Sequence, residues 1–170
     1  RGIPVVVYDN FSPQIHGVVS PTLSIFRQSP SVSVIHADIR DAGNLLRALD
    51  GVTHVIHLAA ETGTGQSMYE IERYCSVNSH GTAVLMSCLM DLRGGGVERI
   101  VLASSRSIYG EGAYFCRQCN LRASPPPRSR KQLELGEWDM KCTCDGCDVA
   151  LDVVPTREDD PKNPASVYAA

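Results

Sequence analysis

The sequence of 170 residues has few aromatic side chains, little excess charge of either sign and no long apolar run. A net charge of −3 does not fit a protein that binds nucleic acid mainly through its charge. The longest stretch without charged residues, 74–90, contains Ser, Asn, His, Gly and Thr, so no membrane span is predicted. No basic-then-apolar start indicates a signal peptide. With 43% hydrophobic residues, we expect a globular cytoplasmic protein without membrane or nucleic-acid partners.

Short β-branched runs alternate with helical patterns along the first part of the chain. The runs 4–8, 32–36, 54–58 and 99–103 predict buried parallel strands. A helix is predicted over 41–50, capped by Asp41 and ended by Gly51, whereas 11–31 is expected to be mostly loop. A longer helix is predicted from the glycine-rich loop 61–68 to about Leu92, ended by glycines 94–96. This alternation predicts an α/β fold with a Rossmann-like, doubly wound parallel sheet.

The alternation stops at residue 111 and resumes only near Pro155. The intervening stretch contains five cysteines, three consecutive prolines at 125–127 and the single tryptophan. We therefore predict a partial Rossmann-like domain over 1–110, an inserted module over 111–154, and a return to the first domain over 155–170.

The cysteines of the insertion have the spacing of a metal site. Cys116-x-x-Cys119 and Cys144-x-x-Cys147 are typical of a zinc ribbon with four thiolate ligands, which would be structural because no position stays open for water. Cys142 could replace one ligand, but the Gly-Cys ending of the second pair favours Cys144 and Cys147. A redox pair or disulfides are the alternatives, and the module could also form a lid or a subunit contact. Outside the insertion, Cys75 and Cys88 are expected to be small buried apolar residues.

Polar and small residues follow the predicted strands, where ligands bind in parallel sheets. Asp9 is placed to accept hydrogen bonds from adenosine ribose hydroxyls, which favours NAD over NADP; alternatively it only starts a turn. Asp38 could bind the adenine amino group while Ile39 packs on the ring, or Asp38 could belong to a helix cap. The pair Ala59-Ala60 would let a cofactor approach closely, or it merely fills a tight turn.

A serine and a tyrosine suggest chemistry on an alcohol. Ser105 follows a strand, and Tyr168 lies at the start of a predicted helix beyond the insertion. Together they could move the hydroxyl proton while a hydride leaves the same carbon.

These segments together resemble the extended short-chain dehydrogenase/reductases, in particular the NAD-dependent nucleotide-sugar epimerases and dehydratases. The resemblance implies that Ser105 and Tyr168 are catalytic and that one group of residues binds NAD. That group is Asp9, Asn10, Asp38, Ile39, Leu58, Ala59, Ala60 and Asn78. The resemblance rests on six motifs in the order of the family: Val5-Val6-Val7-Tyr8-Asp9-Asn10, His36-Ala37-Asp38-Ile39-Arg40-Asp41, His57-Leu58-Ala59-Ala60-Glu61, Val77-Asn78-Ser79-His80-Gly81-Thr82, Ser104-Ser105-Arg106-Ser107-Ile108-Tyr109-Gly110 and Ser166-Val167-Tyr168.

One departure favours epimerisation over dehydration. Dehydratases of the family have Asp-Glu after the catalytic Ser/Thr, whereas this chain has Arg106-Ser107, and arginine does not act as a general acid. Loop 62–71 and the cysteine insertion most resemble the dTDP-L-rhamnose 4-epimerase subfamily. The alternatives are a UDP-glucose 4-epimerase, a dTDP-glucose 4,6-dehydratase-type enzyme, and a non-catalytic truncated relative or zinc-ribbon interaction module.

The family pattern also contains parts that this sequence does not show. They are a first strand with a glycine-rich turn, a lysine after the catalytic tyrosine and a C-terminal sugar-binding lobe. We therefore expect both ends to be cut from something longer, and the 170 residues alone neither to fold stably nor to catalyse. The family's paired helices make a homodimer plausible.

Overall fold

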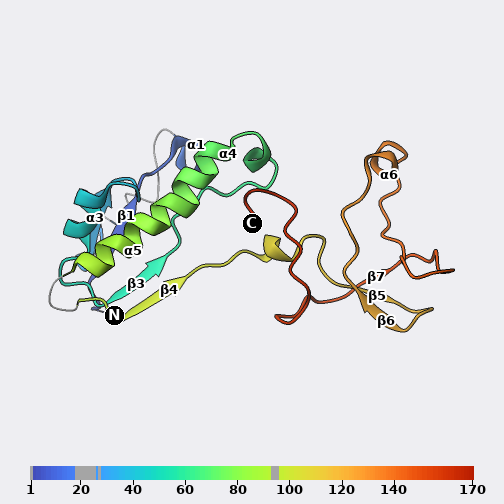
Figure 1. Cartoon of the computed structure of the whole chain (residues 1–170). Helices are drawn as coiled ribbons and strands as arrows, with labels where there is room; N and C mark the ends of the chain where they lie inside the picture. Colours follow the sequence, from blue (N-terminus) through green and yellow to red (C-terminus); the bar gives the residue numbers. More distant parts are fainter. Residues whose placement is uncertain (1, 18–25, 27, 93–95) are drawn as a thin grey trace. The chain divides into compact units, whose positions relative to one another are not determined.

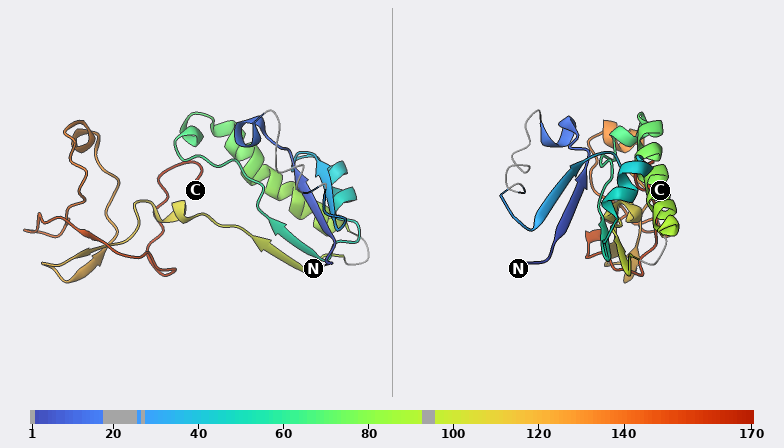
Figure 2. Two further views of the ribbon diagram at one scale, coloured as in Figure 1. Left: turned by 180° about the vertical axis from the view of Figure 1, so that it is seen from behind. Right: turned by 90° about the vertical axis from the view of Figure 1, so that its left-hand side faces the viewer.

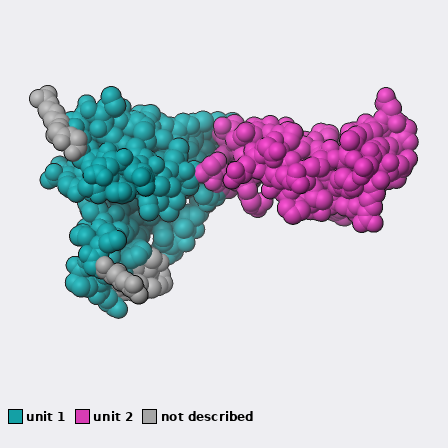
Figure 3. Space-filling model, turned by 90° about the horizontal axis from the view of Figure 1, so that it is seen from below, with its two compact units in different colours: residues 1–62, 70–103 teal, residues 63–69, 104–170 magenta. Residues whose placement is uncertain are grey.

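The computed structural model describes residues 2–17, 26, 28–92 and 96–170. The chain forms two compact units, shown in different colours in Figure 3. Unit 1 comprises Arg1–Thr62 and Glu70–Ala103, and unit 2 comprises Gly63–Tyr69 and Ser104–Ala170. The boundary between the units after residue 103 differs from the predicted domain boundary at residue 110. The division of the chain into three domains remains a prediction.

Unit 1 contains two pairs of parallel strands (Figure 1). Strand β1 (Val5–Asp9) pairs with β2 (Val32–His36), and β3 (His54–His57) pairs with β4 (Arg99–Leu102). All four lie within a residue or two of their predicted positions. The prediction that they are buried is wrong for β4, whose four residues are all exposed, and for the first two residues of β1. The register sets Asp9 opposite His36, so both strands of the first pair end together.

The helices of unit 1 begin and end at recognisable residues. Helix α3 (Ala42–Ala48) starts at Asp41, whose Oδ1 accepts a hydrogen bond from Asn44 N at 3.0 Å, as the cap predicts. The predicted long helix consists of α4 (Ile71–Tyr74), a π-helical turn η2 (Cys75–His80) and α5 (Gly81–Asp91). A four-residue helix α1 (Pro13–His16) interrupts the expected loop 11–31. Residues 18–25, 27, 94 and 95 of these predictions lie outside the described part.

The core of unit 1 lies where α3 and α5 pack side by side (Figure 2). A Cβ added to Gly81 would lie 2.5 Å from Cγ2 of Ile39, so this close approach requires a glycine. Cys88 is buried as predicted, whereas the same prediction for Cys75 is wrong, because its side chain is exposed. The buried core residues are Ile39, Leu45, Leu49, Val77, Leu85 and Cys88.

Unit 2 is built from short elements. The strands β5 (Tyr114–Cys116), β6 (Leu121–Ala123) and β7 (Asp152–Val153) form an antiparallel sheet in the order β6-β5-β7. The 3₁₀ turns η1 (Gln66–Met68) and η3 (Arg106–Tyr109) and helix α6 (Arg130–Glu134) complete it.

The segment around Tyr168 forms a turn rather than the predicted helix start. The backbone amides of Ala169 and Ala170 both donate to Ser166 O at 3.1 Å. Among the described helices, none has the length and apolar character needed to span a bilayer.

Candidate functional site

A cleft of about 260 Å³ lies in unit 1 beyond the carboxyl ends of β1, β2 and β3. Six of the eight predicted cofactor-binding residues line it: Asp9, Asn10, Ile39, Leu58, Ala59 and Ala60. Ligands of doubly wound sheets bind at this edge. The structure thus brings together residues that are up to about fifty positions apart in the sequence.

Asp9 is held by its own turn. Its Oδ1 accepts from Phe11 N at 2.7 Å, and Phe11 has the unusual φ of 45°. The ring of Phe11 packs edge-on against His36, whose Nε2 lies 2.8 Å from Asn10 O. His16 Nε2 lies 3.9 Å from Oδ1 of Asp9. The ring contacts fix the turn, and Asp9 lines the cleft.

Asp38 lies beside the cleft but is engaged by Arg40. The guanidinium donates from Nε and Nη2 to the two carboxylate oxygens at 2.8 Å, and it lowers the pKa of Asp38 to about 2. The Tyr8 hydroxyl donates to Asp38 O at 2.8 Å. Burial raises the pKa of Tyr8 to about 12, so this donor stays protonated. Asp38 could still accept from an adenine amino group, because a carboxylate accepts several hydrogen bonds.

The turn after β3 is fixed by Asn78, which does not line the cleft itself. Asn78 Oδ1 accepts from Glu61 N at 2.8 Å, and Nδ2 donates to Glu61 O at 3.1 Å. The Glu61 side chain is 10% exposed and pairs with Arg73 at 2.8 Å. Sequence reasoning missed this ion pair, since the two residues show no helical or strand spacing. The pair fastens the Ala59-Ala60 turn to the start of the long helix.

The two predicted catalytic residues both lie in unit 2. Ser105 precedes η3, and its Oγ accepts from Ser107 N at 3.2 Å. The backbone amide of Tyr168 donates to the Oγ of Ser67, a fully buried serine, at 3.0 Å. Asn163 N donates to Ile108 O at 2.8 Å and so joins the segments that lead to Ser105 and Tyr168. Ser67 was not identified from the sequence, where it looked like part of a glycine-rich loop.

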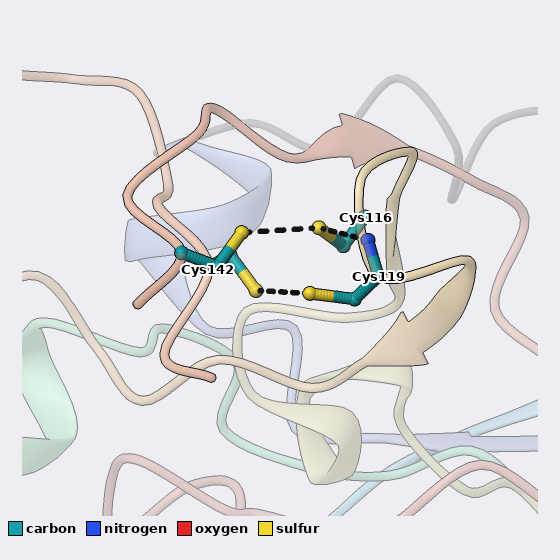
Figure 4. A group of neighbouring side chains, drawn as sticks. Cys116, Cys119 and Cys142 are labelled. Atoms are coloured by element: carbon teal, nitrogen blue, oxygen red, sulfur yellow. Dashed lines mark hydrogen bonds between the residues drawn. The ribbon is translucent and has the colours of Figure 1, made fainter. Parts of the chain in front are cut away.

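Unit 2 also contains a cluster of four cysteine sulfurs (Figure 4). The Sγ atoms of Cys116, Cys119, Cys142 and Cys147 all lie within 4.8 Å of one another. Three of these were predicted as ligands, but Cys142 takes the fourth place and Cys144 is exposed outside the group. Hydrogen bonding to the Cys144 backbone lowers the pKa of Cys142, which favours the thiolate form of this cysteine.

The sulfur spacing suits a metal better than disulfides. Cys116 and Cys147 have their sulfurs 3.7 Å apart, and those of Cys119 and Cys142 are 3.8 Å apart. A tetrahedral zinc with bonds of about 2.3 Å separates its sulfur ligands by about 3.8 Å, whereas a disulfide needs about 2.05 Å. All seven cysteines are free thiols. The four sulfur donors and their spacing therefore fit a metal ion that is bound by four thiolates.

Two pairs of parallel strands, packed helices and a cleft at the carboxyl ends of the strands make unit 1 an α/β unit with its cleft where parallel sheets bind ligands. Residues 1–131 match the NAD dependent epimerase/dehydratase family. The chain belongs to this family, and the resemblance inferred from the six motifs is confirmed.

Two curated relatives and one solved structure illustrate the relationship. The chain is 37% identical to dTDP-L-rhamnose 4-epimerase of Burkholderia thailandensis over 100% of this chain and 44% of the relative. It is 32% identical to UDP-glucose 4-epimerase of Streptomyces lividans over 65% of this chain and 31% of the relative. A dTDP-glucose 4,6-dehydratase of Streptomyces venezuelae, solved with NAD and TYD bound, has a TM-score of 0.63. That match has 24% identity and covers 99% of this chain and 38% of the other.

The predicted Rossmann-like α/β fold is therefore confirmed. The zinc ribbon predicted for the insertion is not confirmed by these comparisons. The chain spans less than half the length of both curated relatives.

Proposed function

We propose that the protein is an NAD-dependent nucleotide-sugar 4-epimerase acting on dTDP-L-rhamnose. The observation that supports it best is the meeting of Asp9, Ile39 and Ala59 in one cleft at the strand ends. The relative that matches all of this chain, insertion included, is a dTDP-L-rhamnose 4-epimerase. A UDP-glucose 4-epimerase is the alternative, because a relative of that name matches 65% of the chain.

The cleft residues fit NAD by their chemistry. The Asp9 carboxylate suits the two ribose hydroxyls and would repel a 2′-phosphate. Ile39 offers an apolar surface for adenine, and the backbone at Ala59-Ala60 is open to close approach because the side chains are small. Asn10 and Leu58 complete the walls, while Asn78 acts only through the backbone of Glu61.

The cleft residues Asp9, Ile39 and Ala59-Ala60 would hold NAD, which when bound would supply the hydride acceptor and donor for C4 of the sugar. Tyr168 would accept the proton of the C4 hydroxyl at its phenolate oxygen and give it back when the 4-keto sugar is reduced. Ser105 Oγ would donate a hydrogen bond to the same C4 oxygen, which steadies the negative charge on that atom. The two proton movements cancel over one cycle, so the net change is inversion at C4.

Dehydration is disfavoured by the residues after Ser105. A dehydratase needs an acid and a base to remove water, and η3 provides Arg106 and Ser107 there. Arg106 is exposed and permanently charged, so it cannot deliver a proton to a leaving hydroxyl.

The experiment is to incubate the protein, purified as its full natural polypeptide, with dTDP-L-rhamnose and NAD in D₂O and to follow the sugar by proton NMR. We expect the C4 epimer to form without deuterium at C4, because the hydrogen returns from the cofactor. UDP-glucose and dTDP-glucose serve as comparison substrates. A 4-keto-6-deoxy product from dTDP-glucose would identify a dehydratase, and no turnover of any sugar would favour the non-catalytic interaction module.

We further propose that the cysteine cluster binds a structural zinc ion in a reducing, cytoplasmic environment. Four thiolates fill a tetrahedral shell, so the ion would stabilise the fold without activating water. The insertion has few buried large apolar residues, and ion binding would supply folding free energy to it.

A further inference from the structure

The acidic loop at 158–160 is anchored to the rest of unit 2 through Asp160. The Asp160 side chain is only 12% exposed and accepts three hydrogen bonds. Arg122 donates to it from Nη2 at 2.6 Å and from Nε at 3.3 Å, and Arg157 N donates to Oδ2 at 2.6 Å. Two-point contact with a guanidinium fixes the direction of a carboxylate as well as its place.

Arg122 belongs to the cysteine insertion. It lies in β6, which pairs with β5, and β5 ends at Cys116 of the sulfur cluster. The same Arg122 Nη2 also donates to Pro155 O at 3.1 Å. The return loop is therefore held at its first residue and at Asp160 by one side chain of the insertion.

Only seven residues separate Asp160 from Tyr168, and Pro161 and Pro164 restrict the backbone between them. Asn163 N is tied to Ile108 O, in the turn that follows Ser105. At Gly110, the backbone approaches Asn163 so closely that a Cβ added to the glycine would collide with Asn163 O. A shift of the loop at Asp160 would thus move the segments that contain Ser105 and Tyr168.

We propose that Arg122 and Asp160 are positioning residues, through which the metal-binding insertion fixes the segment that presents Tyr168. This inference rests on the proposed epimerase function. It gives the insertion a role in positioning Tyr168, whereas the sequence alone is compatible with a lid or a subunit contact.

The test compares Arg122→Gln with Arg130→Gln in the protein purified as its full natural polypeptide. Arg130 lies in the same insertion and pairs with Glu134 one turn on, and these side chains are 93% and 62% exposed. Hydrogen exchange of peptides within 155–168, which needs no substrate, is the first measurement. The second is a steady-state titration that separates kcat from KM and is accompanied by the Kd for NAD.

Arg122→Gln should speed exchange in 155–168 and lower kcat about tenfold, since small misplacements of reacting groups are costly. The Kd for NAD should stay within twofold, and Arg122→Lys should recover part of kcat. Arg130→Gln should change neither measurement. Unchanged exchange in Arg122→Gln, or faster exchange with unchanged kcat, would overturn the inference. A wild-type protein that epimerises no sugar would overturn the proposed function, and the positioning role would fall with it even if exchange responds.

Discussion

Asn78 occupies both backbone polar groups of Glu61, accepting from its amide at 2.8 Å and donating to its carbonyl at 3.1 Å. The side-chain amide thus does for Glu61 what a neighbouring strand does for a residue within a sheet. Asn78 lies in the π-helical turn η2, and such turns often occur at functional sites. The edge of the cofactor cleft is therefore fixed by a helix rather than by further strand pairing.

We predict that Asn78→Ala lowers the free energy of unfolding by about 1–3 kcal/mol, because two part-buried backbone groups lose their partner. The Kd for NAD should rise as the turn after β3 loosens. Urea unfolding and calorimetric titration measure the two effects. The control is Ser79→Ala, an exposed neighbour in the same turn. Equal behaviour of the two variants would contradict the role given to Asn78.

His57 is connected to the same turn through Thr82. The Thr82 hydroxyl donates to Asn78 O at 2.5 Å, so it must accept from His57 Nε2, which lies 2.9 Å away. Neutral His57 therefore carries its proton on Nε2. Protonation of His57 would place a second proton on Nδ1 and so create a positive charge on a residue that is only 5% exposed. This burial lowers the pKa of His57 below 6.5.

A pH dependence of stability follows from this lowered pKa. The native state binds the His57 proton less readily than the unfolded state, so stability should be full above about pH 6.5 and fall as the pH drops below it. His57→Gln, which keeps a donor toward Thr82, should reduce the loss between pH 7.5 and pH 5. Urea unfolding at both values tests this against His54→Gln, an exposed histidine of the same strand. Identical losses in all three proteins would refute the assignment.

The strands, the Asp41 cap and the cleft-lining residues could be predicted because each depends on a short local pattern. Strand ends of a parallel sheet meet by topology, so Asp9 and Ala59 could be assigned to one site without knowing any contact. Pairs such as Asn78 with Glu61 or Arg122 with Asp160 could not, because nothing in the spacing of 17 or 38 residues specifies them. The cysteine spacing likewise predicts a metal site but does not determine which sulfurs face one another. It therefore favours Cys144, whereas the structure has Cys142 in the cluster.

Tyr168→Phe tests the proposed proton transfer. Loss of the hydroxyl should lower kcat by about 10²–10⁴-fold, the usual contribution of a general acid and base. The Kd for NAD should hardly change, because the residues that line the cleft are in unit 1. The control is Tyr109→Phe, four residues after Ser105 in η3. A Tyr168→Phe protein with wild-type kcat would exclude this residue as the base.

Cys142→Ser and Cys144→Ser separate the two possible fourth ligands. The wild-type protein should bind one zinc per chain by elemental analysis, as should Cys144→Ser, because Cys144 lies outside the sulfur cluster. Cys142→Ser should lose most of its zinc and unfold at lower temperature, since an incomplete thiolate shell no longer supplies the folding free energy of the insertion. Cobalt substitution gives a second measurement, with the absorption of a four-thiolate site expected in the wild-type protein and in Cys144→Ser but not in Cys142→Ser. Metal loss in Cys144→Ser with full zinc in Cys142→Ser would instead support the paired Cys-x-x-Cys ligands, and the sulfur positions in Figure 4 would then not be those of the metal-bound protein.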